Sequence, residues 1–349
     1  MRISLLDRSR TRAGRDEQSA LAESVERAVA AERLGYHRFW VAEHHTVPGI
    51  ASGAPAVSLA AIGRRTERIR LGSGGVMLPN HRPLVVAEQF LMLEALTPGR
   101  IDLGLGRSLG FTAPVREALG RLEASTEDFA AEVGQVRDLL EGTAPLTARP
   151  FAAEPPPMHL LATGAGLGIA ARLGLGVVLG GPVLHADDVG ERVAAYRREF
   201  RPHRGGVPHV MVSMDLLVAD TDAEARELAL PEVWAMVRSR ETGAFPPLRD
   251  PARIREQDLT SREQDRLEKG LARAWAGAPA SLRPRVERVL EATGADEILA
   301  AGATFDRAAL AGSDARVVQP ARLNARRSGR HSADRGAFRK HTLIPSAGS

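Results

Sequence analysis

Short apolar runs alternate along the chain with longer stretches in which apolar residues recur every three or four positions. The run Arg2–Asp7 (RISLLD) is typical of a short buried strand, whereas Gln18–Leu34 has the spacing of a helix. Gly35 follows that stretch, and a glycine just beyond the last turn commonly ends a helix. The same alternation predicts further strands at Arg38–Ala42, Ile69–Ser73, Arg100–Leu105, Met158–Ala162, Val177–Gly180 and, as the longest, His209–Ala219.

Helical patterns separate most of these strands. They cover Ala54–Arg65, His81–Leu96, Ser125–Glu141, a stretch ending at Leu173, and Ala186–Phe200. Repeated strand–helix units predict a parallel sheet with helices outside it, and an eighth strand at Glu297–Ala300 completes a (β/α)8 TIM barrel. A doubly wound open sheet is the alternative, but no glycine-rich dinucleotide turn follows the first strand.

One segment interrupts this pattern and another follows it. Residues 239–284 are rich in Arg, Glu and Pro, with one helix predicted over Ser261–Trp275. We interpret this segment as an insertion into a single barrel domain spanning 1–318, either a lid over the site or a surface excursion. Residues 319–349 are basic and poor in large apolar residues, so we expect a disordered C-terminal tail.

Composition narrows the class of protein. The chain has 349 residues and a formal net charge of +4, but residues 319–349 hold six Arg and one Lys against one Asp. The rest is therefore nearly neutral, which argues against nucleic-acid binding as the main role. The absence of cysteine excludes disulfides, thiolate nucleophiles and Cys-ligated metals. No apolar run has the length of a membrane span and no signal peptide is recognisable, so we expect a cytoplasmic enzyme without a membrane partner.

Four candidate motifs lie where predicted strands end, which is the face on which such barrels carry their active sites. Glu43–His45 follows the second strand, and a histidine there can exchange protons near neutral pH. Ser73–His81 contains paired glycines, which let a backbone approach a flat ligand. Leu103–Ser108 contains Arg107, whose guanidinium suits a phosphate, and Ala162–Gly166 precedes a helix whose free N–H groups can bind one. Each motif alone is equally typical of an ordinary loop or buried histidine, but together they predict a site for an anionic, planar ligand.

Metal binding is the competing interpretation of the histidines. His44, His45 and His81 with Glu43 include residue types that bind zinc, but the helical HExxH spacing is absent. Adjacent histidines on an extended segment point to opposite sides, so they do not readily share one ion. We therefore predict no metal site, with one histidine facing the pocket and the other packed or at an interface.

Three long runs carry a resemblance to a known family. They are LGYHRFWVAEHH (34–45), RIRLGSGGVMLPNHRPLVVAEQF (68–90) and LEALTPGRIDLGLGR (93–107). In this order they resemble the bacterial luciferase-like flavin monooxygenases, over roughly residues 1–315 and most strongly over 1–110. The chain is most similar to single-chain actinobacterial oxygenases, some of which modify polyketide antibiotics.

The resemblance implies roles for individual residues. It makes His44 the catalytic histidine and Gly74–Gly75 a cis-peptide pair beneath the flavin ring. It makes Arg107 the phosphate-binding residue. The remaining residues implied to bind the cofactor are Met77, Ser108, Leu109, Thr163 and Gly164. The chain departs from the family at Gly166, where a second hydroxyl residue is common.

The resemblance also implies the reaction. A separate reductase would supply reduced FMN (FMNH2), O2 would form a flavin C4a-hydroperoxide, and an apolar aldehyde, ketone or polyketide intermediate would be oxygenated. Such barrels often form homodimers. The alternatives are an F420-dependent hydride-transfer enzyme on the same barrel and a flavin-binding protein without catalysis.

Overall fold

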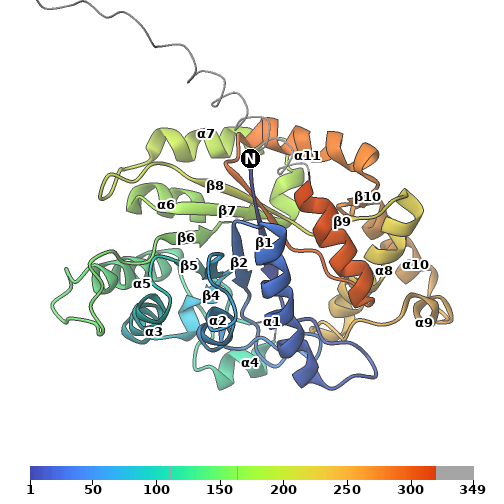
Figure 1. Ribbon diagram of the computed structural model, residues 1–349, viewed down its shortest axis with the longest axis horizontal. Coiled ribbons are helices and arrows are strands. Elements are labelled where there is room, and N and C mark those ends of the chain that lie inside the picture. The colour runs from blue at the N-terminus through green and yellow to red at the C-terminus, as the bar shows by residue number, and fades with distance from the viewer. Residues whose placement is uncertain (111, 163, 320–349) are drawn as a thin grey trace, which may run out of the picture.

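The computed structural model describes residues 1–319 except Phe111 and Thr163. Nine parallel strands form one sheet in the order β3-β2-β1-β11-β8-β7-β6-β5-β4, and an additional β3–β5 pairing closes it into a barrel (Figure 1). The predicted (β/α)8 TIM barrel is therefore confirmed. The strands are β1 (Arg2–Asp7), β2 (Arg38–Val41), β3 (Arg70–Ser73), β4 (Val76–Met77), β5 (Ile101–Gly106), β6 (Met158–Leu161), β7 (Gly176–Gly180), β8 (Val210–Met214) and β11 (Glu297–Ala300).

Helices on the outside connect most of the strands. They are α1 (Glu17–Leu34), α2 (Pro55–Gly63), α3 (Pro83–Leu96), α4 (Ala113–Ala118), α5 (Thr126–Leu140), α6 (Gly166–Leu173), α7 (Val189–Glu199) and α11 (Pro279–Thr293), with short 3-10 turns at Leu78–Asn80 and Gly181–His185. Gly35 ends α1 as predicted: it has φ of 79°, and its N–H donates to the carbonyl oxygens of Ala31 and Glu32.

The predicted strand His209–Ala219 is wrong as a single element. β8 ends at Met214, where the N–H of Leu216 donates to the Met214 carbonyl at 2.8 Å. The chain then turns at Asp215, and β9 (Leu217–Val218) pairs outside the barrel with β10 (Ala276–Gly277). The apolar pattern continues across the turn because the residues on both sides of Asp215 are buried, so periodicity alone does not reveal the break.

The irregular segment forms a helical group beside the barrel. The group consists of α8 (Asp222–Thr242), α9 (Pro251–Arg255) and α10 (Ser261–Arg273), the last matching the helix predicted over Ser261–Trp275. It begins earlier than the predicted range 239–284, at Asp222, and α11 already begins within that range, at Pro279. Figure 1 shows these three helices together on one side, away from α3 and α5. A cluster of buried residues that includes Trp234, Ile254 and Leu267 holds them together.

Charged residues fill the barrel near the amino ends of its strands. Arg38 contacts Asp102 at 2.7 Å and Glu297 at 3.0 Å, and Arg70 contacts Asp102 at 2.6 Å. The side chains of Asp102 and Glu297 have no exposed surface. This network is far along the strands from their carboxyl ends, so it supports the barrel rather than the candidate site.

The described chain ends in a helix over 307–319. Nearly all of the predicted basic tail, from residue 320 onward, lies outside the described residues. Among the helices of residues 1–319, none combines the length and apolarity needed to cross a membrane.

Candidate active site

The paired glycines lie where β3 passes into β4. The Gly74–Gly75 peptide bond is cis, as the family resemblance implied. Val76 and Met77 in β4 lie opposite Leu105 and Gly106 in β5. The two strand ends therefore bring Met77 next to the backbone that leads into Arg107.

Close approach of the backbones explains Gly75 and Gly104, and the side chains of Leu6 and Trp40 fill the space beside Gly74. A Cβ on Gly104 would lie 2.1 Å from the carbonyl oxygen of Ser73, and one on Gly75 would lie 2.8 Å from that of Gly104. The Ser73 hydroxyl also bridges the strands, donating to the Gly104 carbonyl at 2.8 Å. We call Gly74, Gly75 and Gly104 the glycine bed.

The predicted phosphate ligands follow the neighbouring strands. Arg107 and Ser108 are exposed after β5, and Leu109 is partly buried. The Arg107 guanidinium donates to the Thr126 hydroxyl at 2.6 Å. After β6, Gly164 is exposed with φ of 71°, and a Cβ added there would have no atom within 4 Å.

The second predicted phosphate site is the start of α6. Thr163, predicted here as a cofactor ligand, lies outside the described residues. The N-cap of α6 is Ala165, whose side chain forms no capping hydrogen bond. Because first-turn N–H groups attract anions, this end of α6 can receive a phosphate without a second hydroxyl at Gly166.

His44 lies just beyond β2, partly buried, with its backbone N–H donating to the Ser52 carbonyl at 2.8 Å. Burial, together with the guanidinium groups of Arg8 and Arg10, lowers the pKa of His44 to about 4. Its imidazole is therefore neutral at pH 7. In that state a ring nitrogen can accept a proton, as a general base does.

The neighbouring histidine belongs to a separate cluster. Nε2 of His45 and Nε2 of His81 each lie 2.7 Å from the same Glu43 oxygen, Oε1, and the Met77 N–H donates to Oε2 at 3.1 Å. Burial opposes ionisation of Glu43, but the hydrogen bonds from His45 and His81 lower the pKa of its carboxyl. The cluster thus joins the loop after β2 to β4.

The same cluster contains three of the four residues that the sequence analysis considered as metal ligands. Glu43, His45 and His81 bring ligand atoms within 4.8 Å of one another, whereas His44 is not part of the group. Both imidazoles already bond to one carboxylate oxygen, so hydrogen bonding alone accounts for the geometry. The prediction of no metal site stays a prediction.

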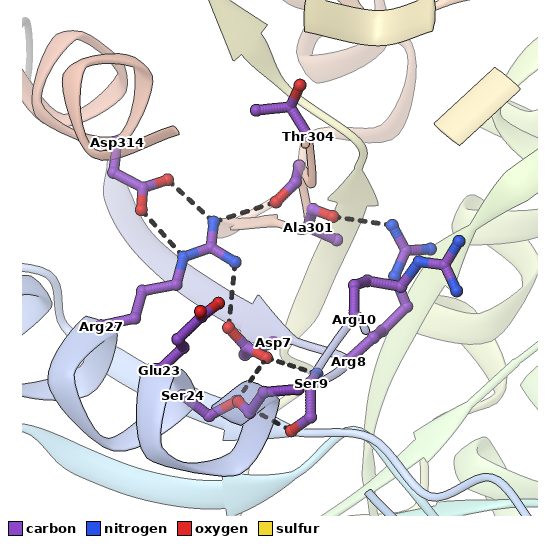
Figure 2. Close-up of polar contacts among 12 residues, drawn as sticks. Asp7, Arg8, Ser9, Arg10, Glu23, Ser24, Arg27, Ala301, Thr304 and Asp314 are labelled. Carbon is purple, nitrogen blue, oxygen red and sulfur yellow. Dashed lines mark hydrogen bonds and ion pairs between the residues drawn. The ribbon is translucent and has the colours of Figure 1, made fainter. Parts of the chain in front are cut away.

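Sequence reasoning missed the charged residues after β1. Asp7 accepts hydrogen bonds from Ser24 at 3.0 Å and from Arg27 at 3.1 Å. Arg8 turns away from that group and donates to the Ala301 carbonyl at 2.8 Å (Figure 2). The only signal in the sequence is the alternation of arginines in RSRTR, which a solvated loop would also have.

Arg8 and Arg10 hold two acidic residues over the barrel. Arg8 contacts Asp215 at 2.7 Å and Glu232 at 3.4 Å, and Arg10 contacts Glu232 at 2.9 Å. Burial opposes ionisation of Glu232, but Arg10 and Arg8 lower the pKa of its carboxyl. The same two arginines lower the pKa of His44, so this network and the histidine are electrostatically connected.

The fold is that of a TIM-barrel enzyme, and comparison with known proteins identifies its family. The family described as Luciferase-like monooxygenase matches residues 1–314, and the chain belongs to it. It is 35% identical over 315 residues to "Luciferase-like monooxygenase" of Escherichia coli (strain K12), covering 88% of this chain and 93% of the relative.

Two further comparisons agree. The chain is 40% identical over 194 residues to "N-acetyl-S-alkylcysteine monooxygenase" of Bacillus subtilis (strain 168), covering 51% of this chain and 56% of the relative. The crystal structure of apo-MsnO8 superposes with a TM-score of 0.79 at 30% identity, covering 89% of this chain and 96% of that one. The chain is thus a flavin-dependent monooxygenase.

The residues present fit a flavin that carries a phosphate. The glycine bed lets β3, β4 and β5 pack closely, because a Cβ at any of its three positions would clash with neighbouring protein atoms, and this brings the backbone of Gly74–Gly75 against β5. Arg107 and the start of α6 follow adjacent strands, β5 and β6, and offer positive charge and N–H donors.

Proposed function

We propose that the protein is the oxygenase of a two-component system, which receives reduced FMN from a separate flavin reductase and oxygenates an apolar organic substrate. The observation that carries this proposal is the pairing of β4, which directly follows Gly74–Gly75, with the end of β5 that leads into Arg107. Membership of the family supports a reduced flavin as cofactor.

Each predicted site residue has a proposed task. The flat face of the flavin lies on Gly74–Gly75 and against Met77. The phosphate binds Arg107 and the start of α6, which includes Gly164. Ser108, Leu109 and Thr163 complete the enclosure of the cofactor.

Bound reduced flavin supplies the two electrons that activate O2, so that one oxygen atom enters the substrate and the other leaves as water. His44 accepts a proton from the reacting groups, because its neutral imidazole is the form present at pH 7. The loops over the strand ends exclude water, which limits loss of the activated oxygen as hydrogen peroxide.

The test is an anaerobic titration of the full chain with FMNH2 and, separately, with reduced F420, followed by rapid mixing with O2. We expect tight FMNH2 binding and a delay between oxygen consumption and the appearance of oxidised flavin. Binding of F420 alone, without any reaction with O2, would establish a hydride-transfer enzyme instead. Binding of FMNH2 that leaves its reaction with O2 unchanged from free flavin would leave a flavin-binding protein without catalysis.

We also propose a homodimer through α2 and α3. Val85, Met92 and Leu96 of α3 and Val57 of α2 are exposed large apolar residues, and the two helices pack together. Positions 85, 92 and 96 share one face of a helix. Sedimentation should give a dimer for the wild type and a monomer for Met92→Glu, whereas a wild-type monomer would refute the proposal.

The proposed oxygenase function also suggests a cellular location and a biological role. We place the enzyme in the cytoplasm, because it must share reduced flavin with a reductase. We propose modification of a polyketide antibiotic as its biological role, because a polyketide intermediate is an apolar substrate.

A further inference from the structure

A cavity lies at strand ends other than those that carry the glycine bed. It is a cavity of about 600 Å³ at the carboxyl ends of β7 and β8, closed on its outer side by α8 and the end of α10. No glycine-bed residue lines it. The helical group after β9 therefore forms one wall of a space on the active-site face.

The inner end of the cavity is polar. Asp215 has 52% of its side chain exposed, whereas its partners Arg8 and Glu232 have 20% and 14% exposed. Burial nevertheless raises the pKa of the Asp215 carboxyl, although Arg8 opposes this. The exposed side-chain surface and the raised pKa are consistent if the exposed side of Asp215 faces the cavity and not bulk solvent. Protein surrounds the cavity, so a carboxylate there is only partly hydrated.

The turn after β8 places Asp215 there. The Leu216 N–H closes the turn onto Met214, and the Leu217 N–H donates to the Trp275 carbonyl at 2.9 Å. Asp215 is thus fixed between a barrel strand and the end of α10. Its position is set by backbone bonds and does not depend only on the contact with Arg8.

Most of the remaining wall is apolar, although Arg273 at the end of α10 also lines it. Leu217, Val233, Met236 and Trp275 line it. The Trp275 ring stacks on His185 with centroids 5.3 Å apart and 14° between the planes. This stack presents a rigid aromatic surface to whatever enters.

The charges at the inner end balance. Arg8 and Arg10 face Asp215 and Glu232, so two positive groups meet two negative groups. A carboxylate ligand would meet the exposed oxygens of Asp215, where Arg8 and Arg10 are already paired; the further cation of the lining, Arg273, belongs to the end of α10. A neutral donor can give a hydrogen bond to Asp215 while leaving the ion pairs intact.

From these features we propose that the cavity binds the organic substrate, that the substrate carries a hydroxyl group on an apolar body, and that Asp215 accepts a hydrogen bond from that hydroxyl. The apolar body lies along Trp275 and Met236. This inference rests on the proposed oxygenase function, because it assigns the substrate of that reaction. Asp215 is then a specificity-determining residue.

The test uses binding alone, without flavin, so its outcome is separate from that of the proposed function. The full chain is titrated calorimetrically with three eight-carbon probes: 1-octanol, 2-octanone and octanoate. We expect 1-octanol to bind about tenfold more tightly than 2-octanone, the order expected for one hydrogen bond to a charged acceptor. Octanoate should bind most weakly.

Variants assign the preference to Asp215. Asp215→Ala should bind 1-octanol and 2-octanone equally, and Asp215→Asn, which keeps a carbonyl acceptor, should retain part of the preference. Asp258→Ala, on the exposed loop after α9, is the matched control and should behave as the wild type. Trp275→Ala should weaken both neutral probes alike. Thermal melting verifies that each variant is folded.

Three results would overturn the proposal. They are equal binding of octanoate and 1-octanol, an unchanged preference in folded Asp215→Ala, and no binding of any probe to the wild type. In each case the anaerobic FMNH2 titration of the same preparation shows whether the oxygenase assignment still stands.

Discussion

His44 should make the stability of the protein depend on pH in a calculable way. Its pKa is about 4 in the folded protein, compared with about 6.5 for an ordinary histidine. Between these values the unfolded chain binds a proton at this position and the folded protein does not. Acidification through this window therefore favours unfolding. The reason is that the free energy of unfolding decreases as the pH decreases wherever the unfolded state binds more protons than the folded state.

The size of the effect follows from the two pKa values. Relative to pH 7, protonation of the unfolded chain at His44 removes about 2 kcal/mol of stability at pH 4.5. His44→Asn cannot bind that proton. The wild type should thus lose about 2 kcal/mol more than the variant between pH 7 and pH 4.5.

The assay is urea denaturation of both proteins at matched ionic strength across this range. Other titrating groups contribute equally to both and cancel in the difference. His44→Gln serves as a second variant and should give the same pH dependence as His44→Asn. A wild-type-minus-variant difference that stays constant from pH 7 to pH 4.5 would refute the lowered pKa of His44 in the folded protein.

Three further changes probe the barrel and the cofactor site. Asp102→Ala leaves Arg38 without its 2.7 Å partner inside the barrel, so urea denaturation should show a loss of about 3–5 kcal/mol. Gly104→Ala would put a methyl group 2.1 Å from the Ser73 carbonyl oxygen, so it should lower the unfolding free energy by about 1–3 kcal/mol. Arg107→Gln should weaken FMN binding about tenfold, measured by quenching of flavin fluorescence, because it removes the charge proposed to hold the phosphate.

Each of these three variants has a control, which is either another variant of the chain or a different flavin. Lys269→Ala removes an exposed ion pair and should change stability by less than about 1 kcal/mol, so an equal loss there would undermine the Asp102 argument. Gly134→Ala, inside α5 with no atom within 4 Å, should stabilise. Riboflavin has no phosphate and should bind Arg107→Gln as it binds the wild type; a parallel loss would place the effect elsewhere.

Most of the barrel could be predicted because its strands are short apolar runs between amphipathic helices. The strand end after β8 could not, since the residues flanking Asp215 are buried both inside the barrel and in the adjoining two-stranded sheet. The helix over 307–319 was also missed. This helix carries Asp314, which contacts Arg27 of α1 at 2.9 Å although the two residues are far apart in the sequence.

The candidate site also contains some residues that the sequence reveals and others that it does not. Gly74, Gly75 and Arg107 could be proposed as site residues from the sequence because local motifs and the family resemblance mark them. Arg8, Glu232 and Asp215 form a group only through tertiary contacts between distant segments, which no local pattern encodes. The separation of His44 from the His45 cluster was foreseen in part, from the opposite directions of adjacent side chains on an extended segment.

The most direct test of the account is a crystal structure of the full chain with FMN. We predict the ring on the Gly74–Gly75 peptide and the phosphate between Arg107 and the start of α6, with the cavity beside Asp215 left open for the substrate. A flavin bound in the cavity beside Asp215, with Gly74–Gly75 uncovered, would contradict both the cofactor site and the substrate assignment.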